Sequence, residues 1–163
     1  MPPPAPKQAK KKRPFCWKTA LELQLPYPPS ANRLWRRQRG RMMLSGAALA
    51  YRQTVAGLWW TERQQQNLQP IGPRKCRIKI LAHPPDRRPR DLDNLLKPLL
   101  DALQWAGIME NDSQVQGLSI RWANIRPGGQ VRVRLLVRQQ PMMEQTIYVR
   151  DVEAVRRLLD RPP

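Results

Sequence analysis

Histidine, cysteine and acidic residues are scarce in this 163-residue chain, and each scarcity excludes a class of site. One histidine, His83, and two distant cysteines, Cys16 and Cys76, cannot by themselves build a zinc site or a disulfide framework. No apolar run approaches the roughly 20 residues of a membrane-spanning helix, and the N-terminus lacks the apolar segment of a secretory signal. We therefore expect a protein of the reducing cytoplasm that does not enter membranes.

Basic residues far outnumber acidic ones in this chain. The chain has 30 Lys+Arg against 12 Asp+Glu, a formal net charge of +18 at pH 7, which favours binding to phosphate groups of nucleic acid. Six of the 12 acids nevertheless fall between Asp86 and Asp112. Clustered carboxylates repel a polyanion unless a positive group bridges the two, and a divalent metal ion is such a bridge. The pattern therefore predicts a nuclease rather than a passive binder.

Composition divides the chain into three parts. Residues 1–18 are proline-rich and then basic, which is typical of a disordered arm that either adds DNA affinity or is only a solvated tail. Residues 19–139 have the patterns of one folded domain. Residues 140–163 form an extension, in which apolar residues at helical spacing over 151–160 predict a short helix.

Strand and helix patterns alternate within the domain. Residues 20–25, 75–83, 118–122 and 131–137 alternate apolar and polar side chains and predict strands. The last two flank Arg126-Pro-Gly-Gly129, which predicts a hairpin. A helix capped by Ser45 is predicted over about 47–65, with an apolar stripe of Ala48, Tyr51, Val55, Leu58 and Trp59. Residues 33–41 have five arginines and no hydrophobic period, which predicts a loop.

A second helix is expected after the strand that ends at His83. Leucines at helical spacing run from Leu92 to Leu103 until Gly107 ends the pattern, and Pro98 predicts a kink within it. The sequence therefore predicts an α/β (α+β) fold, a single compact domain with a mixed sheet of about four strands and two main helices.

The acids around this helix have two interpretations. In the structural one, Asp91 caps the helix, Asp93, Lys97 and Asp101 form an i, i+4, i+8 ladder of ion pairs, and Asp86 is loop surface. In the catalytic one, Asp91 and Asp93 lie at a strand-to-helix junction, where site residues are common. Mg²⁺ prefers such carboxylates and completes its coordination with water and substrate phosphate.

Two other residues complete the catalytic interpretation. Lys97, one turn after Asp93, is placed to neutralise charge in the transition state or to position water. Asp112 follows a helix about 20 Å long, so it can join Asp91 only if the chain returns toward the start of that helix.

Spaced motifs run through the middle of the chain. The downstream set is Asp91-Leu-Asp93-Asn94-Leu-x-Lys97, Asp101-Ala-Leu103, Gly107 and Asp112-x-Gln114-Val115. The upstream set is Leu25-Pro-Tyr-Pro-Pro-Ser30-x-Asn32-Arg33, Arg39-Gly40-Arg41, Ser45 and Tyr51-Arg52. Together they resemble the RusA-type Holliday junction resolvases over roughly residues 21–136.

This resemblance implies a homodimeric, Mg²⁺-dependent endonuclease (Mn²⁺ being a possible substitute) that acts on branched DNA, the four-way junction, in recombination and repair within a bacterial or phage-infected cell. It implies that Asp91, Asp93 and Asp112 are the metal ligands and that Lys97 is the catalytic lysine. A C2 dimer also suits the approximate two-fold symmetry of a four-way junction. Many members place two adjacent acids where this chain has Asn111-Asp112, so Asn111 supplies no second charge.

Two groups of arginines are predicted to hold DNA phosphates rather than to read bases: Arg33, Arg36, Arg37, Arg39 and Arg41, and Arg87, Arg88 and Arg90. Two alternatives remain open at this point. One is a non-catalytic architectural or RNA-binding protein, whose binding would weaken steeply with salt and which would cut nothing. The other is a nuclease for other branched DNA, such as flaps or replication forks.

Overall fold

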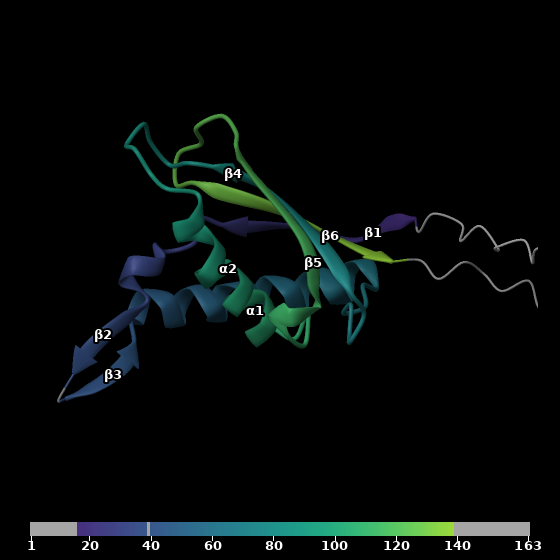
Figure 1. The fold of residues 1–163 in the computed structure, drawn as a ribbon, viewed down its shortest axis with the longest axis horizontal. Helices are drawn as coiled ribbons and strands as arrows, with labels where there is room; N and C mark the ends of the chain where they lie inside the picture. Colours follow the sequence, from purple (N-terminus) through teal and green to yellow (C-terminus); the bar gives the residue numbers. More distant parts are fainter. Residues whose placement is uncertain (1–15, 39, 139–163) are drawn as a thin grey trace, which may run out of the picture.

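A four-stranded sheet with two helices on one face forms the body of the protein (Figure 1). The computed structural model describes residues 16–38 and 40–138. Its elements are β1 (Trp17–Pro26), η1 (Ala31–Arg33), β2 (Trp35–Gln38), β3 (Arg41–Leu44), α1 (Gly46–Gln66), β4 (Cys76–His83), α2 (Asp93–Trp105), η2 (Asp112–Gln114), β5 (Val115–Trp122) and β6 (Gln130–Arg138). The predicted α+β class and mixed sheet are confirmed.

Strand order in the sheet is β1-β6-β4-β5. β6 runs antiparallel to both β1 and β4, whereas β5 runs parallel to β4. The predicted hairpin of residues 118–122 and 131–137 is therefore wrong, because β4 lies between β5 and β6. The connection β4–α2–β5 is a crossover, which places β5 parallel to β4, and alternation along a strand carries no information about its partner.

The core lies between the sheet and the two helices. Leu21, Leu23 and Leu25 of β1 and alternate residues of β4 and β6 point toward α1 and α2. On α1, Tyr51, Val55 and Trp59 are buried as predicted, and Ser45 accepts a hydrogen bond from the backbone N–H of Ala48. Leu58 is 38% exposed, so it does not belong to the buried stripe in which it was predicted.

The start of α2 differs from the structural interpretation of the sequence. Leu92 is the N-cap, its conformation is helical, and no side chain caps the helix, so Asp91 is not the cap. Pro98 is buried inside α2, and the helix continues through it to Trp105. The carboxylate of Asp91 therefore makes no capping hydrogen bond to the backbone of α2.

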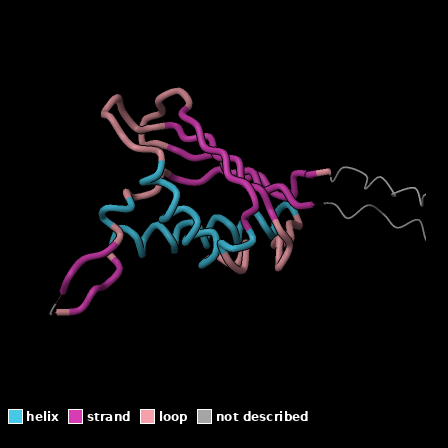
Figure 2. The backbone as a smooth tube through the Cα atoms, in the orientation of Figure 1, coloured by secondary structure: helices cyan, strands magenta, loops and turns pink. Residues whose placement is uncertain are grey.

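Residues 33–41 are not a loop. Trp35–Gln38 pair with Arg41–Leu44 as an antiparallel hairpin, with Gly40 in the turn at φ +76°. Figure 2 shows this hairpin projecting away from the sheet and the helices. A hairpin in which Trp35 and Met42 are exposed among arginines has no buried face, which explains why its sequence shows no strand-like alternation.

The chain ends fall largely outside the described residues. β1 begins at Trp17, so the last two residues of the predicted arm belong to a strand. The rest of that arm and the 140–163 extension, with its predicted helix, lie outside the residues that the structure describes. Among the described residues, no helix is both long and apolar enough to cross a membrane.

Candidate active site

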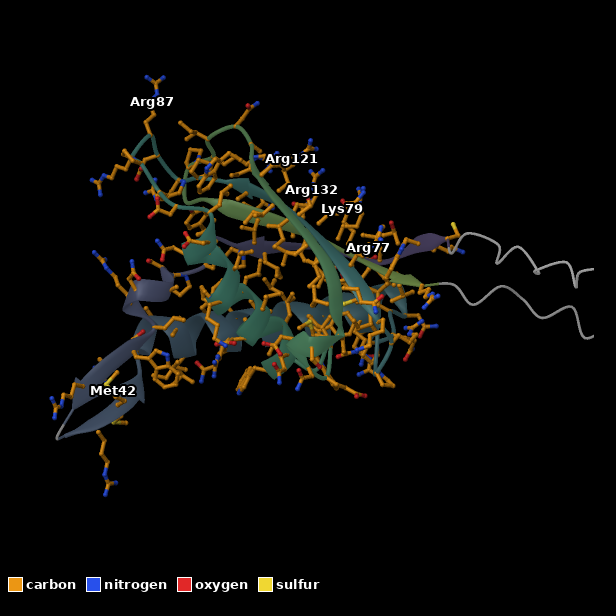
Figure 3. The ribbon with its side chains drawn as sticks, viewed as in Figure 1. Met42, Arg77, Lys79, Arg87, Arg121 and Arg132 are labelled. Carbon is orange, nitrogen blue, oxygen red and sulfur yellow. The ribbon has the colours of Figure 1, made fainter. Side chains whose placement is uncertain are left out.

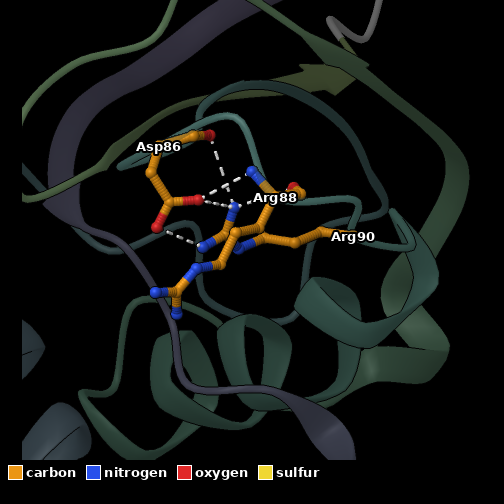
Figure 4. Close-up of polar contacts among 3 residues, drawn as sticks. All are labelled: Asp86, Arg88 and Arg90. Atoms are coloured by element: carbon orange, nitrogen blue, oxygen red, sulfur yellow. Dashed lines mark hydrogen bonds and ion pairs between the residues drawn. The ribbon is translucent and has the colours of Figure 1, made fainter.

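The loop between β4 and α2 is held by one ion pair (Figure 4). The Arg90 guanidinium donates to both carboxylate oxygens of Asp86, at 2.7 and 2.9 Å, and the backbone N–H of Arg88 donates to the same carboxylate at 2.8 Å. The hydrogen bond from Arg90, more than that from Arg88, lowers the pKa of Asp86 to about 2. Asp86 lies on the loop surface as predicted, with its side chain 43% exposed, and these bonds also make it a structural anchor of the loop.

Asp91 and Asp93 lie just beyond this anchor, at the start of α2. Both are exposed. The Asn94 side-chain amide donates to Asp91 Oδ2 at 3.3 Å, and the Asn94 backbone N–H donates to Asp93 Oδ1 at 2.9 Å. Within the described parts of the chain neither carboxylate has an ion-pair partner. Two adjacent carboxylates with oxygens free toward solvent suit a hard cation such as Mg²⁺.

Lys97 lies one turn further along α2. Its ammonium nitrogen is 2.7 Å from Asp101 Oδ1, and the other Asp101 oxygen is 3.2 Å from a nitrogen of Arg52 on α1. The predicted ladder of ion pairs therefore has only its second half, because Lys97 pairs with Asp101 and not with Asp93. Asp101 links the two helices and fixes the direction of the Lys97 side chain, which stays 61% exposed.

Asp112 begins η2, and a buried glutamine holds that turn. Gln114 is 5% exposed and accepts from the backbone N–H groups of Glu110 and Asn111, at 2.8 and 2.7 Å. Its amide donates to the carbonyls of Gly72 and Arg74, which precede β4. Asn111, in place of a second acid, is the N-cap of η2 and accepts from Ser113 N–H at 2.8 Å. The carboxylate of Asp112 is exposed.

The three predicted metal ligands do not come together within one chain. β5 is parallel to β4, so Asp112, three residues before β5 begins, lies beside the start of β4, whereas Asp91 follows the end of β4. The 13 residues of α2 span about 20 Å between these two edges. In the described residues no three His, Cys, Asp or Glu side chains form a group that could hold a metal ion.

The predicted phosphate-binding arginines divide by their surroundings. Arg33 ends η1, and Arg36, Arg37 and Arg41 lie on the projecting hairpin, while Arg39 falls outside the described residues. Arg87 and Arg88 are exposed on the β4–α2 loop, with Arg87 at its tip (Figure 3). Arg90 is bound to Asp86 and lies 5.9 Å from the Tyr27 ring, so its donors are largely occupied.

Asp91 borders two hollows. One has a volume of about 570 Å³ and includes Pro84, Arg88 and the exposed side chains of Trp122 and Ile125 in its lining. The other, of about 680 Å³, lies toward η1 and is lined by Arg33 and Asn94 among others. Arginine therefore reaches the surroundings of Asp91 from two sides.

The sequence did not reveal two sets of contacts that position this site, those of the Asp86–Arg90 pair and those of Gln114. The Asp86–Arg90 pair is signalled only by an i, i+4 spacing, which carries little weight outside a helix. Gln114 gives no signal except its place in the quoted motif, because burial of one glutamine cannot be read from composition. His83 is 6% exposed and its Nδ1 lies 2.7 Å from the Asn124 carbonyl, so it is buried at the end of the strand predicted over 75–83.

A known protein family matches most of this chain. The endodeoxyribonuclease RusA family matches residues 26–135, which contain all of the predicted site residues. A crossover junction endodeoxyribonuclease of Enterobacteria phage HK97 is 38% identical over 111 residues, 68% of this chain and 89% of that protein. Those of Escherichia coli K12 and Shigella sonnei are each 38% identical over 114 residues, 69% of this chain and 91% of theirs.

Proposed function

Because the chain belongs to the endodeoxyribonuclease RusA family, we propose that it is a junction-resolving endonuclease, which nicks Holliday junctions at paired, symmetrical positions in DNA recombination and repair. The observation that carries this is the family match over residues 26–135 together with two carboxylates at the start of α2 that form no ion pair with any described residue. The net charge of +18 supports a polyanionic substrate. A passive binder does not explain why these two carboxylates lack an ion pair among the many basic residues that the structure describes.

Asp91 and Asp93 would hold Mg²⁺, with Mn²⁺ as a possible substitute, and Asp112 would be their third partner. A bound ion of this kind supplies charge stabilisation for an in-line attack of water on the phosphodiester. Lys97 would hold a negatively charged phosphate oxygen near Asp93, and the Asp101 carboxylate would orient it. Arg88 and Arg33, which border the two hollows beside Asp91, would hold the DNA backbone.

A homodimer would bring Asp112 of one protomer close to Asp91 and Asp93 of the other. Two copies of α2 packed antiparallel about a two-fold axis would place the start of one helix beside the end of the other. Asp91 and Asp93 of one protomer would then approach Asp112 of its partner, giving two identical sites. The exposed Trp105 at the end of α2 and the exposed Trp60 on α1 support an interface on the helical side.

A cleavage assay tests this proposal. A synthetic four-way junction incubated with the protein and Mg²⁺ should be nicked at symmetrical positions, and the same junction in EDTA should stay intact. The Asp93→Asn variant should bind the junction in EDTA as the wild type does but should not nick it. Nicking by this variant at the wild-type rate would exclude Asp93 from the metal site, and absence of nicking by the wild type would refute the function.

A further inference from the structure

The face of the sheet opposite the helices is strongly basic. On β4, Arg77 and Lys79 alternate with buried residues and point away from α1 and α2. In Figure 3 the side chains of Arg121, Arg132, Lys79 and Arg77 follow one another along the sheet. Arg134 lies opposite Lys79 in the register. Neither the loop arginines nor the acidic site accounts for these five charges.

Strand register places the charges in adjacent rows. Leu81 has Arg132 on one side and Arg121 on the other, and Lys79 has Arg134 on one side and Ser119 on the other. Paired residues of neighbouring strands share a face, and like charges directly opposite each other destabilise a sheet. The pairing of Lys79 with Arg134 therefore gives the sheet no stabilisation, so the fold itself does not explain the charge of Lys79.

Acidic side chains on this face of the sheet neutralise only part of its positive charge. Glu22 pairs with Arg134 at 2.6 Å and with Arg132 at 3.8 Å. The side chains of Lys79 and Arg121 have no hydrogen bond or ion pair to any described residue. One carboxylate thus serves two of the arginines, and two further cations stay available to a ligand.

The face is also shaped to admit an extended polyanion. A shallow hollow of about 290 Å³ on it is lined by Lys79, Leu81, Ser119, Arg121, Arg132 and Arg134. Gly117 and Ser119 of β5 have small side chains or none beside the long side chains of β4. The Arg77 guanidinium lies over the Trp17 ring, 4.4 Å from its centroid. The eight residues of β4 extend about 26 Å, a length equal to about eight base pairs of duplex.

The basic face and the candidate active site lie at the same end of β5 but on opposite sides of the sheet. Arg121 points to the helix-free face, whereas Trp122, the next residue, lines a hollow together with Asp91. We propose that the helix-free face of the sheet is a second DNA-binding surface, which holds the phosphate backbone of a duplex arm leaving the junction. Such a surface would not be an interface between copies, since two faces of this charge repel each other. The inference rests on the proposed function, because it assumes junction DNA at Asp91.

The test measures binding in EDTA, so that it does not depend on cleavage. Lys79→Gln/Arg121→Gln should bind a four-way junction roughly tenfold or more weakly than wild type near 0.1 M salt, and the slope of log K against log salt should fall by roughly 2. The control Arg63→Gln removes a half-buried charge from α1, on the other side of the sheet, and should leave the slope within about 0.3 of wild type. Single-turnover nicking at saturating protein should be unchanged in the double variant.

A chemical change in the DNA gives a second, independent readout. The wild type should bind a junction with neutral methylphosphonate linkages, from about the third to the eighth base pair of each arm, as weakly as the double variant binds natural DNA. The same linkages should weaken binding by the double variant only slightly further. A wild-type salt slope in the double variant would overturn the inference. So would a change in its sedimentation, which would assign the face to protein contacts. If the wild type fails to bind or nick the junction, the proposed function fails; if only the variant result fails, this inference fails alone.

Discussion

Asp93 and Asp112 lie at opposite ends of the β4–α2–β5 crossover, about 20 Å apart along α2, although both belong to the motif set of one nuclease family. The parallel pairing of β5 with β4 requires this separation, because the chain must travel the length of the sheet before β5 can begin. Under the proposed function, a site that uses both acids would therefore be built from two chains. Several measurable consequences follow from this geometry and from the contacts around it.

Lys97→Met should reduce nicking without weakening the fold. Its side chain is 61% exposed, and among the described residues its ammonium pairs only with Asp101. An exposed pair of this kind contributes at most about 1 kcal/mol to stability. The nicking rate, measured under single turnover, should fall roughly a hundredfold or more if Lys97 stabilises the transition state. If the variant nicked DNA at the wild-type rate and its urea unfolding were also unchanged, Lys97 would have no part in nicking.

Asp101 should couple α1 to α2. Its carboxylate contacts Arg52 at 3.2 Å and Lys97 at 2.7 Å, and it is only 17% exposed. In a double-mutant cycle by urea unfolding, Arg52→Ala and Asp101→Ala should show a coupling free energy of about 0.5–1 kcal/mol. Strictly additive effects would mean that this contact does not tie the helices together in solution.

The Asp86 carboxyl should titrate near pH 2. Its folded pKa is lowered, so its contribution to stability is present above its unfolded pKa of about 3.9 and is lost as pH falls through about 2. Carboxyl NMR shifts followed over pH 1.5–5 should show this, and Arg90→Gln should move the Asp86 titration upward. An ordinary titration near pH 4 in wild type would show that the pair does not hold the loop.

Gln114→Leu should destabilise the protein by about 3 kcal/mol or more. The substitution keeps the side-chain volume close but leaves two backbone N–H groups and two carbonyls without their partner, each worth roughly 1 kcal/mol or more when buried. Gln114→Glu keeps the oxygen acceptors and loses the N–H donors, so its free energy of unfolding should lie between those of the wild type and the leucine variant. Urea unfolding measures both variants, and a loss under 1 kcal/mol in the leucine variant would show that water replaces these bonds easily.

Much of the fold could be predicted from local patterns. The alternation of 75–83 and the leucine spacing after Leu92 located β4 and α2, because a buried face imposes its period on the sequence. The projecting hairpin was missed because it has no buried face, and the pairing of β5 with β4 was missed because partners are chosen over long range. The motif that contains Asp91, Asp93 and Asp112 pointed to the family, but the spacing alone could not tell that these residues lie on two edges of the sheet.

Mixed dimers test the shared site most directly. Asp93→Asn and Asp112→Asn should each lose nicking, by about a hundredfold or more, as expected for removal of a ligand. Co-expressed with different affinity tags and purified as the mixed dimer, they should regain nicking of a four-way junction, because one of the two sites then has Asp93 from one protomer and Asp112 from the other. A mixed dimer as inactive as either parent, although it binds the junction in EDTA, would contradict a site built from two chains.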